Sequence, residues 1–308
     1  MVMSFFTFIF PYIFCISATG FMFYARDRNV VSTKKKRQAE KSLWQYLFPR
    51  EAFGTKSAKI DYILFFLNGF VFTPLFFVLW GLIIYTLHID TGFVAESLKI
   101  SFDKIDLSPI NFFMALLVFI MVDATNAFLH YLSHKSSFLW QFHKVHHNAT
   151  SLNMFTADRH HPVSIAFVFF VSQIVIVTFI RLLAWLMPIQ FDAVMVWAIL
   201  SLMTTLLKPI DMLKHVHVWM SWGPLNYVFQ SPAMHQIHHS VDPKFHHKNF
   251  GAYFSVWDQL LGTLCVPDSK MDITYGLKVD IDGSSDSESL KYSLLNPFKR
   301  VFAKFKKK

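Results

Sequence analysis

The chain has 308 residues, of which 54% are hydrophobic, 18% aromatic and 16% charged, and its mean hydropathy is +0.38. This composition departs from that of a soluble globular domain and favours a membrane protein. The formal charge of +9 does not indicate nucleic-acid binding, because the basic residues flank apolar segments without an interleaved stacking platform. The two cysteines, Cys15 and Cys265, give neither a disulfide framework nor a thiolate metal pattern.

Apolar segments of helical length occur along most of the chain. Four are close to the roughly 20 residues that cross a hydrocarbon core as a helix. They are Ser4–Tyr24, Tyr62–Leu87, Ile110–Leu132 and Val163–Met187. A fifth, Phe191–Leu207, is shorter and follows Pro188, so we expect it to span only as the second arm of a hairpin. The sequence therefore predicts an all-α, polytopic transmembrane bundle with four or five spans.

The charge of the loops predicts the orientation of these spans. The loop after the first span is dense in Lys and Arg, whereas the segment from His88 to Ser108 balances its two lysines with acidic residues. Short basic loops stay on the cytoplasmic side. We therefore expect an outside N-terminus and a cytoplasmic location for residues 132–162 and 208–308. We therefore predict a multi-pass membrane protein, located in the endoplasmic reticulum if the source is eukaryotic or in the inner membrane if it is bacterial.

The histidines are concentrated in the second half of the chain. All of the 15 histidines except His88 lie between His130 and His247. Eight of them form groups with i, i+3 or i+4 spacing, which places each group on one helix face. These are His130 and His134; His143, His146 and His147; and His235, His238 and His239. A single histidine near a membrane is more often structural than a ligand, but repeated ordered groups favour a metal site.

The ligand type restricts the metal. Imidazole suits zinc, copper, iron and nickel, and the lack of paired cysteines disfavours a structural zinc cage or an iron–sulfur cluster. Eight or more convergent imidazoles exceed what one ion can use, so the pattern predicts two ions in a cytoplasmic helical cap.

Several motifs occur in a fixed order between Asp123 and Leu264. Asp123 stands seven residues before the sequence HYLSH, and SFLWQFHKVHHN and RHHP follow. His215 lies eight residues before GPLNYVF, and MHQIHHS, NFG and WDQLLGT complete the series. Together they resemble the fatty acid hydroxylase and sterol desaturase superfamily of membrane di-iron proteins.

The resemblance implies specific roles. It adds His161, in preference to its neighbour His160, and His215 to the ligand set. The implied metal ligands are His130, His134, His143, His146, His147, His161, His215, His235, His238 and His239. Asp123 would accept a hydrogen bond from His130, Asn249 would support ligands, and His217 would either support a ligand or be an additional one. His246 and His247 fall in a segment that varies in the family, which favours a solvated or supporting role.

The resemblance also implies a membrane-bound di-iron oxygenase that hydroxylates or desaturates a lipid, either a sterol, a fatty acyl chain or a related molecule. Two iron ions would be the cofactor and dioxygen the co-substrate. The chain has no glycine-rich dinucleotide fingerprint and no CxxCH, so a separate reductase with a cytochrome-type or ferredoxin carrier is implied. We expect N-terminal spans and a basic loop in residues 1–109, the catalytic domain in 110–268 and a flexible basic tail in 269–308.

Two other functions compete with this interpretation. A zinc hydrolase would need a glutamate base, as in HExxH, and no glutamate lies among the histidine motifs. A histidine-rich membrane metal transporter or sensor would need ionisable residues along a path at mid-membrane depth, and the predicted spans hold few.

Overall fold

The computed structural model describes residues 13–21, 42–86, 108–187, 191–277 and 289–305. Four helical runs in these residues are long and apolar enough to cross a membrane: Lys56–Thr86, Pro109–Lys135, Pro162–Leu186 and Ala193–Leu213. They confirm the predicted spans from Tyr62 onward, including the shorter fifth. The first predicted span, Ser4–Tyr24, lies partly outside the described residues, and its described part, 13–21, is helical. The loop expected between His88 and Ser108 lies outside them up to residue 107.

The first of these runs is continuous but irregular. It consists of α4 (Lys56–Leu67), a π-helical turn η1 (Asn68–Phe72) and α5 (Thr73–Thr86). Pro74 has no N–H to donate to the carbonyl of Phe70, and its ring crowds that carbonyl. The backbone instead bonds Thr73 N–H to the Asn68 carbonyl, five residues earlier. The turn places Asn68 and Gly69 beside the cavity described below.

Of the other three spans, one packs against both of the others. Both α9 (Pro162–Leu186) and α10 (Ala193–Leu213) pack against α7 (Pro109–Lys135), while α5 packs on α9. Pro109 and Pro162 open their helices at a position where the missing N–H costs nothing. Apolar side chains fill the core between these spans, among them Met114, Val118, Ile180, Ile199 and Leu200. Large apolar side chains also cover the outer surface of the spans, as a lipid-facing surface requires.

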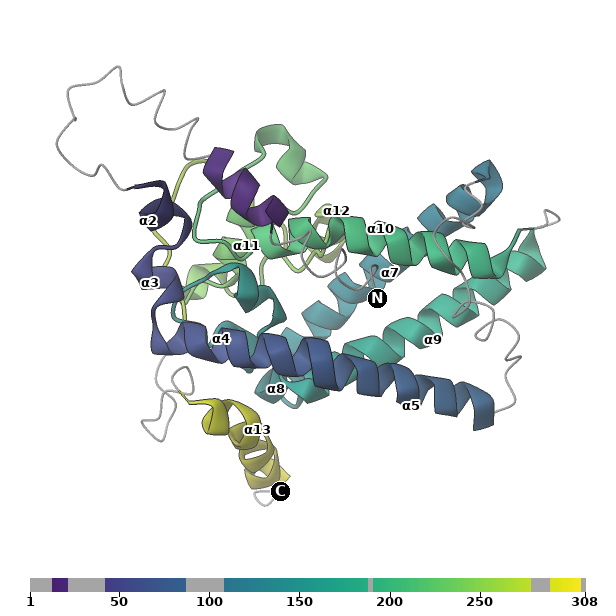
Figure 1. Cartoon of the computed structure of the whole chain (residues 1–308), viewed down its shortest axis with the longest axis horizontal. Coiled ribbons are helices and arrows are strands. Elements are labelled where there is room, and N and C mark those ends of the chain that lie inside the picture. The colour runs from purple at the N-terminus through teal and green to yellow at the C-terminus, as the bar shows by residue number, and fades with distance from the viewer. Residues whose placement is uncertain (1–12, 22–41, 87–107, 188–190, 278–288, 306–308) are drawn as a thin grey trace.

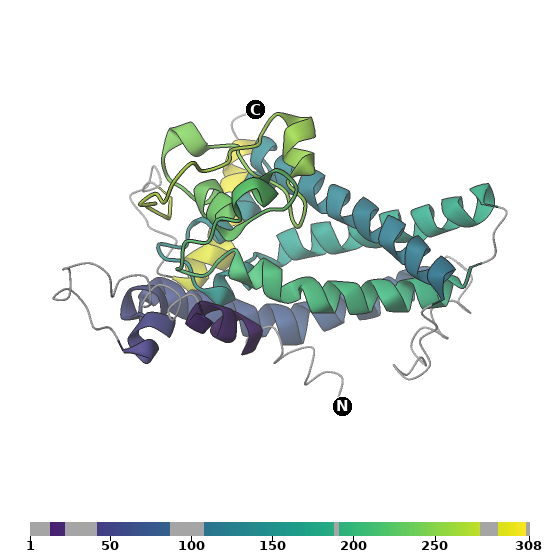
Figure 2. The ribbon, with the colours of Figure 1, turned by 90° about the horizontal axis from the view of Figure 1, so that it is seen from above.

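The remaining elements gather at one end of the spans, as Figures 1 and 2 show. Short helices and turns form this helical cap. They are α2 (Leu43–Leu47), α3 (Arg50–Phe53), α8 (Leu139–His147), η3 (Met154–Asp158), η4 (Gly223–Tyr227), α11 (Pro232–His238), η5 (Pro243–Phe245) and α12 (Val256–Leu261). The described residues thus form the predicted all-α membrane bundle with a histidine-rich cap.

Part of the segment expected to be a flexible tail is helical. Helix α13 (Leu290–Phe305) packs against α8. Its Leu294 carbonyl accepts a hydrogen bond from His161 Nε2 at 3.1 Å, and the Phe298 ring lies 5.3 Å from the Phe142 ring. The sequence did carry a signal for this helix, because Leu290, Leu294, Phe298, Val301 and Phe305 recur at helical spacing. The expected flexible stretch before it lies outside the described residues up to residue 288.

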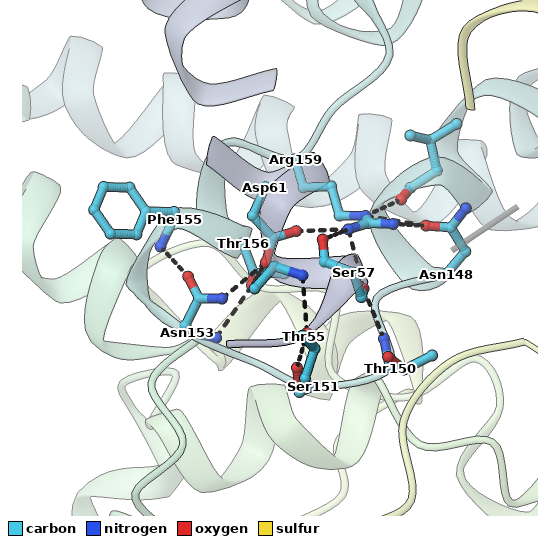
Figure 3. A network of polar contacts seen from close by, with 12 residues as sticks. Thr55, Ser57, Asp61, Asn148, Thr150, Ser151, Asn153, Phe155, Thr156 and Arg159 are labelled. Atoms are coloured by element: carbon cyan, nitrogen blue, oxygen red, sulfur yellow. Dashed lines mark hydrogen bonds and ion pairs between the residues drawn. The ribbon is translucent and has the colours of Figure 1, made fainter. Parts of the chain in front are cut away.

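A buried ion pair joins the first span to the cap (Figure 3). Arg159 Nη1 lies 2.7 Å from Asp61 Oδ1, and neither side chain is exposed. Asp61 Oδ2 accepts hydrogen bonds from Asn153 and Thr156, and the Arg159 guanidinium also donates to Asn148 Oδ1. Nearly every polar atom of the pair therefore has a partner, which offsets much of the cost of burying two charges. The pair fixes α4 against the loop that follows α8.

Replacing Arg159 with methionine should destabilise the protein severely. The change leaves the Asp61 carboxylate buried without its cation, and breaking such a pair costs about 3–5 kcal/mol. The free energy of unfolding, measured in mild detergent, would report this loss. Lys244→Met is the matched control, because the Lys244–Asp242 pair is exposed at 66% and 44% and such pairs contribute at most about 1 kcal/mol. Equal effects of the two substitutions would contradict the role given to Arg159.

Candidate metal centre

The histidine motifs converge because the helices that carry them lie in the cap or end there. His130 and His134 lie on the last turns of α7, and His143, His146 and His147 occupy the second half of α8. His235 and His238 lie on α11, His239 is its C-cap, and His215 follows α10. Nine of the ten histidines implied as ligands therefore meet in two adjacent groups.

The first is a five-histidine group of His130, His134, His143, His147 and His238. One ligand nitrogen from each lies within 4.8 Å of all the others. The Nε2 atoms of all five are buried and have no hydrogen-bond partner among the described residues. Five unmet lone pairs facing one another are costly in a protein interior, and a cation in their midst would satisfy them.

Backbone carbonyls orient two of these rings. His130 Nδ1 lies 3.0 Å from the Phe250 carbonyl, and His238 Nδ1 lies 2.7 Å from the Lys248 carbonyl. A carbonyl only accepts, so each Nδ1 carries the ring hydrogen and donates it. The tautomer is therefore the one whose Nε2 lone pair is available for a metal.

The second is a four-histidine group of His146, His215, His235 and His239. Its Nε2 atoms form close pairs: His146 with His215 at 3.3 Å, His215 with His235 at 2.9 Å, and His235 with His239 at 3.2 Å. His215 Nδ1 donates to the Asp211 carbonyl at 3.2 Å, so its Nε2 presents a lone pair to the other rings. This donor set also suits a shared cation.

In the two histidine groups, burial favours the neutral form of the rings that lie outside the membrane spans. Burial lowers the pKa of His143, His146 and His147 well below the usual value, and it lowers the pKa of His215 to about 3. Burial has the same effect on the pKa values of His235, His238 and His239. Neutral imidazole is the form that binds metals, so each of the two groups could hold an ion.

His161 does not belong to this site, contrary to the expectation from the RHHP motif. Its Nδ1 accepts from Val163 N–H at the start of α9, and its Nε2 donates to the Leu294 carbonyl of α13. Both nitrogens are therefore engaged elsewhere. His160 instead stacks on His146, with ring centroids 4.4 Å apart and planes 15° apart. Spacing alone could not separate these neighbours, because the direction of each ring depends on the turn after η3.

Asp123 also has a different partner from the one expected. It accepts hydrogen bonds from Tyr253 N, Phe254 N and Trp257 Nε1, at 2.9, 3.1 and 2.7 Å. His130 donates to the Phe250 carbonyl instead. The carboxylate therefore acts on the same segment that orients His130, and its effect on the ring is indirect. The sequence pattern placed Asp123 near His130 but could not reveal the backbone of residues 250–257 between them.

Asn249 and His217 differ in their relation to the site. Asn249 donates to the carbonyls of Met234 and Cys265, and it accepts from Cys265 N–H, so it ties α11 to the end of the domain. This agrees with a supporting role. His217 Nε2 lies 2.8 Å from the Tyr46 carbonyl and the residue joins neither histidine group. It therefore links the cap to α2 rather than to a metal.

Two cavities adjoin the histidines on different sides. The larger has a volume of about 600 Å³ and is lined by residues of all four spans together with His130, His143, His146, His160, His215 and His235. The smaller, of about 380 Å³, is lined by His134, Trp140, His147, His238 and His239. His246 and His247 line the smaller cavity, are exposed, and belong to neither group. The centre thus lies between a cavity among the membrane spans and one in the cap.

Sequence reasoning did not single out Lys208, Lys214 or Asn68, which line the larger cavity. Lys208 and Lys214 form ion pairs with Asp158 and Asp211, and Asn68 donates to the carbonyls of Asp158 and His160. Ionisable residues at the end of an apolar segment were the available signal, since such residues are rare there without a function.

These features define a class, namely membrane-spanning proteins with a histidine-built candidate metal centre. A family model described as fatty acid hydroxylase matches residues 115–263, which include both histidine groups. The matched residues, just under half of the chain, confirm the resemblance to the fatty acid hydroxylase and sterol desaturase superfamily that the motifs show.

Named relatives agree with this assignment. The ornithine lipid hydroxylase OlsE of Rhizobium tropici is 30% identical over 148 residues, which are 48% of this chain and 40% of that protein. The alkylglycerol monooxygenases of Danio rerio and Homo sapiens are 26% and 24% identical, over 52% of this chain and 32% of each of those proteins. The chain thus matches well under half the length of each of these relatives. No solved structure matches it.

Substitution within one histidine group should remove one metal ion. We expect the purified protein to hold about two ions per chain, and His238→Ala or His146→Ala to lower this to about one by removing a ligand from one group. Elemental analysis by mass spectrometry would measure the content. His161→Asn keeps a capping side chain and should retain both ions. Loss of metal from His161→Asn, or none from the other two variants, would contradict the assignment.

Asp123→Asn should reduce stability without reducing metal content. The amide cannot accept all three N–H groups, and leaving buried donors unmet costs about 1–3 kcal/mol each. Thermal unfolding together with metal content separates the two roles. If Asp123 acted directly on a ligand, the variant would lose metal affinity roughly 10- to 100-fold at unchanged stability.

Proposed function

We propose that this protein is a membrane-bound di-iron oxygenase that hydroxylates or desaturates a lipid. The observation that carries the proposal is the position of the nine imidazoles, most of them buried, next to a cavity lined by residues of four apolar spans. The names of the relatives, a lipid hydroxylase and monooxygenases, support the same reaction class. They do not favour the metal transporter or sensor, and we do not pursue it.

The donor set is compatible with iron. The two groups contain imidazole only, which suits iron, zinc and copper, and the resemblance to a family of di-iron oxygenases supports iron among these. The five-histidine and four-histidine groups would each hold one ion. When bound, the pair of irons would supply the activation of dioxygen for attack on an unactivated C–H bond.

The chain's own residues do the rest. Carbonyls of Phe250 and Lys248 hold the rings of His130 and His238 in the ligating tautomer. Aromatic and aliphatic side chains of the larger cavity, including Phe65, Val168 and Phe169, would align an apolar chain and exclude water. Because the cavity lies among the spans, a lipid would reach it from the bilayer.

The reaction needs electrons from outside the chain. In hydroxylation, one atom of dioxygen enters the C–H bond, and the other leaves as water after taking up two electrons and two protons. In desaturation, two hydrogens leave the substrate and both oxygen atoms become water, again with two external electrons and two protons. We propose a separate reductase with a cytochrome-type or ferredoxin carrier, which the basic surface of the chain would favour if the carrier is acidic.

We propose that residues 110–268 form the catalytic domain and that the cap faces the cytoplasm. The distribution of basic residues in the loops supports this orientation. Membership in a membrane family fits the endoplasmic reticulum in a eukaryote or the inner membrane in a bacterium.

Incubation with isotopic dioxygen tests the proposal directly. The iron-loaded chain in lipid nanodiscs, supplied with a reductant and ¹⁸O₂, should form a lipid product that has gained one ¹⁸O atom or lost two hydrogens. Lipid mass spectrometry would detect either product. The His146→Ala and His238→Ala double variant should form none, because it lacks a ligand in each group. An iron-loaded chain that consumes no dioxygen with any lipid extract would overturn the proposal.

A further inference from the structure

The larger cavity has one strongly polar region, which we call the cavity ion pairs and which consists of Asp158, Lys208, Asp211 and Lys214. Lys208 Nζ lies 3.0 Å from Asp158 Oδ1 and 3.3 Å from Asp211 Oδ2. Lys214 Nζ lies 2.8 Å from Asp211 Oδ1 and also donates to the Ala252 carbonyl. All four residues line the cavity. Two cations and two anions therefore stand in an otherwise largely apolar wall.

Three of these four charges are accessible to a ligand, whereas the Lys214 side chain is only 3% exposed. The side chains of Lys208, Asp158 and Asp211 retain 37%, 27% and 30% exposure, although Lys208 and Asp211 belong to a helix that forms part of the membrane bundle. A wall that binds only hydrocarbon would gain nothing from such groups, because ionisable side chains beside a membrane are costly. Their presence favours a ligand that carries a polar headgroup.

The cavity ion pairs also restrict the charge of that headgroup. They sum to zero, with two lysines and two aspartates, so neither sign is in excess for a strongly anionic or cationic group. They offer both donors and acceptors. Asn68 adds a buried carboxamide oxygen that has no partner in the described part of the chain. A net-neutral headgroup with hydroxyl or ammonium hydrogens matches this set.

The cavity ion pairs adjoin the metal centre. The backbone carbonyl of Asp211 accepts from His215 Nδ1 of the four-histidine group. Asp158 lies two residues before His160, whose ring stacks on His146 at 4.4 Å. A headgroup bound here would hold the first carbons of its chain near the histidines and send the rest along the apolar walls.

We propose that the cavity ion pairs bind the net-neutral, hydrogen-bonding headgroup of the lipid and thereby direct oxidation to carbons close to that headgroup. This inference rests on the proposed oxygenase function for the position of oxidation, whereas headgroup binding is independent of it. Lys208 is the principal specificity-determining residue, since it joins both aspartates.

Binding of three probes with one chain length tests the headgroup site. The probes are 1-O-hexadecylglycerol, hexadecyl phosphate and hexadecane, each competing against radiolabelled hexadecylglycerol on the full chain in nanodiscs. Hydrogen bonds to charged groups should give hexadecylglycerol an affinity at least about tenfold higher than that of hexadecane. Hexadecyl phosphate should not exceed it. Equal affinities for hexadecylglycerol and hexadecane would overturn the proposal.

Variants separate recognition from folding. Lys208→Met should reduce the headgroup preference to near unity, while Lys208→Arg should retain most of it and Lys244→Met, a surface control, all of it. Unchanged metal content would verify that Lys208→Met is folded, and Asp158→Asn, which keeps the side-chain shape, provides a second test with the same expected loss. Retained preference in both the Lys208→Met and Asp158→Asn variants would overturn the assignment.

The site of oxidation completes the test. In active preparations, tandem mass spectrometry of the hexadecylglycerol product should locate the new oxygen or double bond within the first few carbons from the glycerol. Oxidation near the chain end would contradict the proposal. Headgroup-selective binding without any oxidised product would support the headgroup site and count against the oxygenase proposal alone, so the two failures are distinguishable.

Discussion

The structure depends on a single electrostatic constraint, which is that many imidazoles direct ring nitrogens toward one another in a buried volume. In the five-histidine group alone, five Nε2 atoms are buried and unmet. Such an arrangement is unfavourable by itself, so the surrounding structure must hold the rings in place until a cation compensates. The cost of the site explains why so much of the cap consists of polar contacts rather than apolar packing.

Those contacts form a frame around the rings. Asp258 accepts from the N–H groups of Phe250 and Gly251, and Asp123 accepts from those of Tyr253 and Phe254. Together they fix the segment whose Phe250 carbonyl orients His130. The Arg159–Asp61 pair performs a similar task for the loop after α8. Buried carboxylates in this protein therefore act on the backbone, and the backbone acts on the histidines.

The sequence predicted the parts of this structure that follow from periodicity. Span length and mean hydropathy located four helices, and i, i+3, i+4 spacing grouped eight of the nine convergent histidines, with His215 supplied by the family pattern. Most of the predictions that failed depended on long-range geometry. His161 was preferred to His160, Asp123 was paired with His130, and α13 was expected to be flexible. For the first two, the deciding partner, Leu294 or Trp257, lies more than 100 residues away along the chain. For α13 the helical spacing of its apolar residues was a local signal that the expected flexible tail did not take into account.

The π-helical turn at Asn68–Phe72 determines how this span responds to the insertion or deletion of a residue. A turn closed five residues apart accommodates one more residue than an α-helical turn, so the helix beyond it is rotated by about 100° relative to a regular continuation. This extra residue aligns two buried faces. The face of α4 that carries Asp61 and Leu64 points to the same side of the span as the face of α5 that carries Phe76. Two homologous chains of equal hydropathy, one of which has one residue fewer in this turn, would therefore present different faces of α5 to α9. Residue count in this span carries structural information that hydropathy does not record.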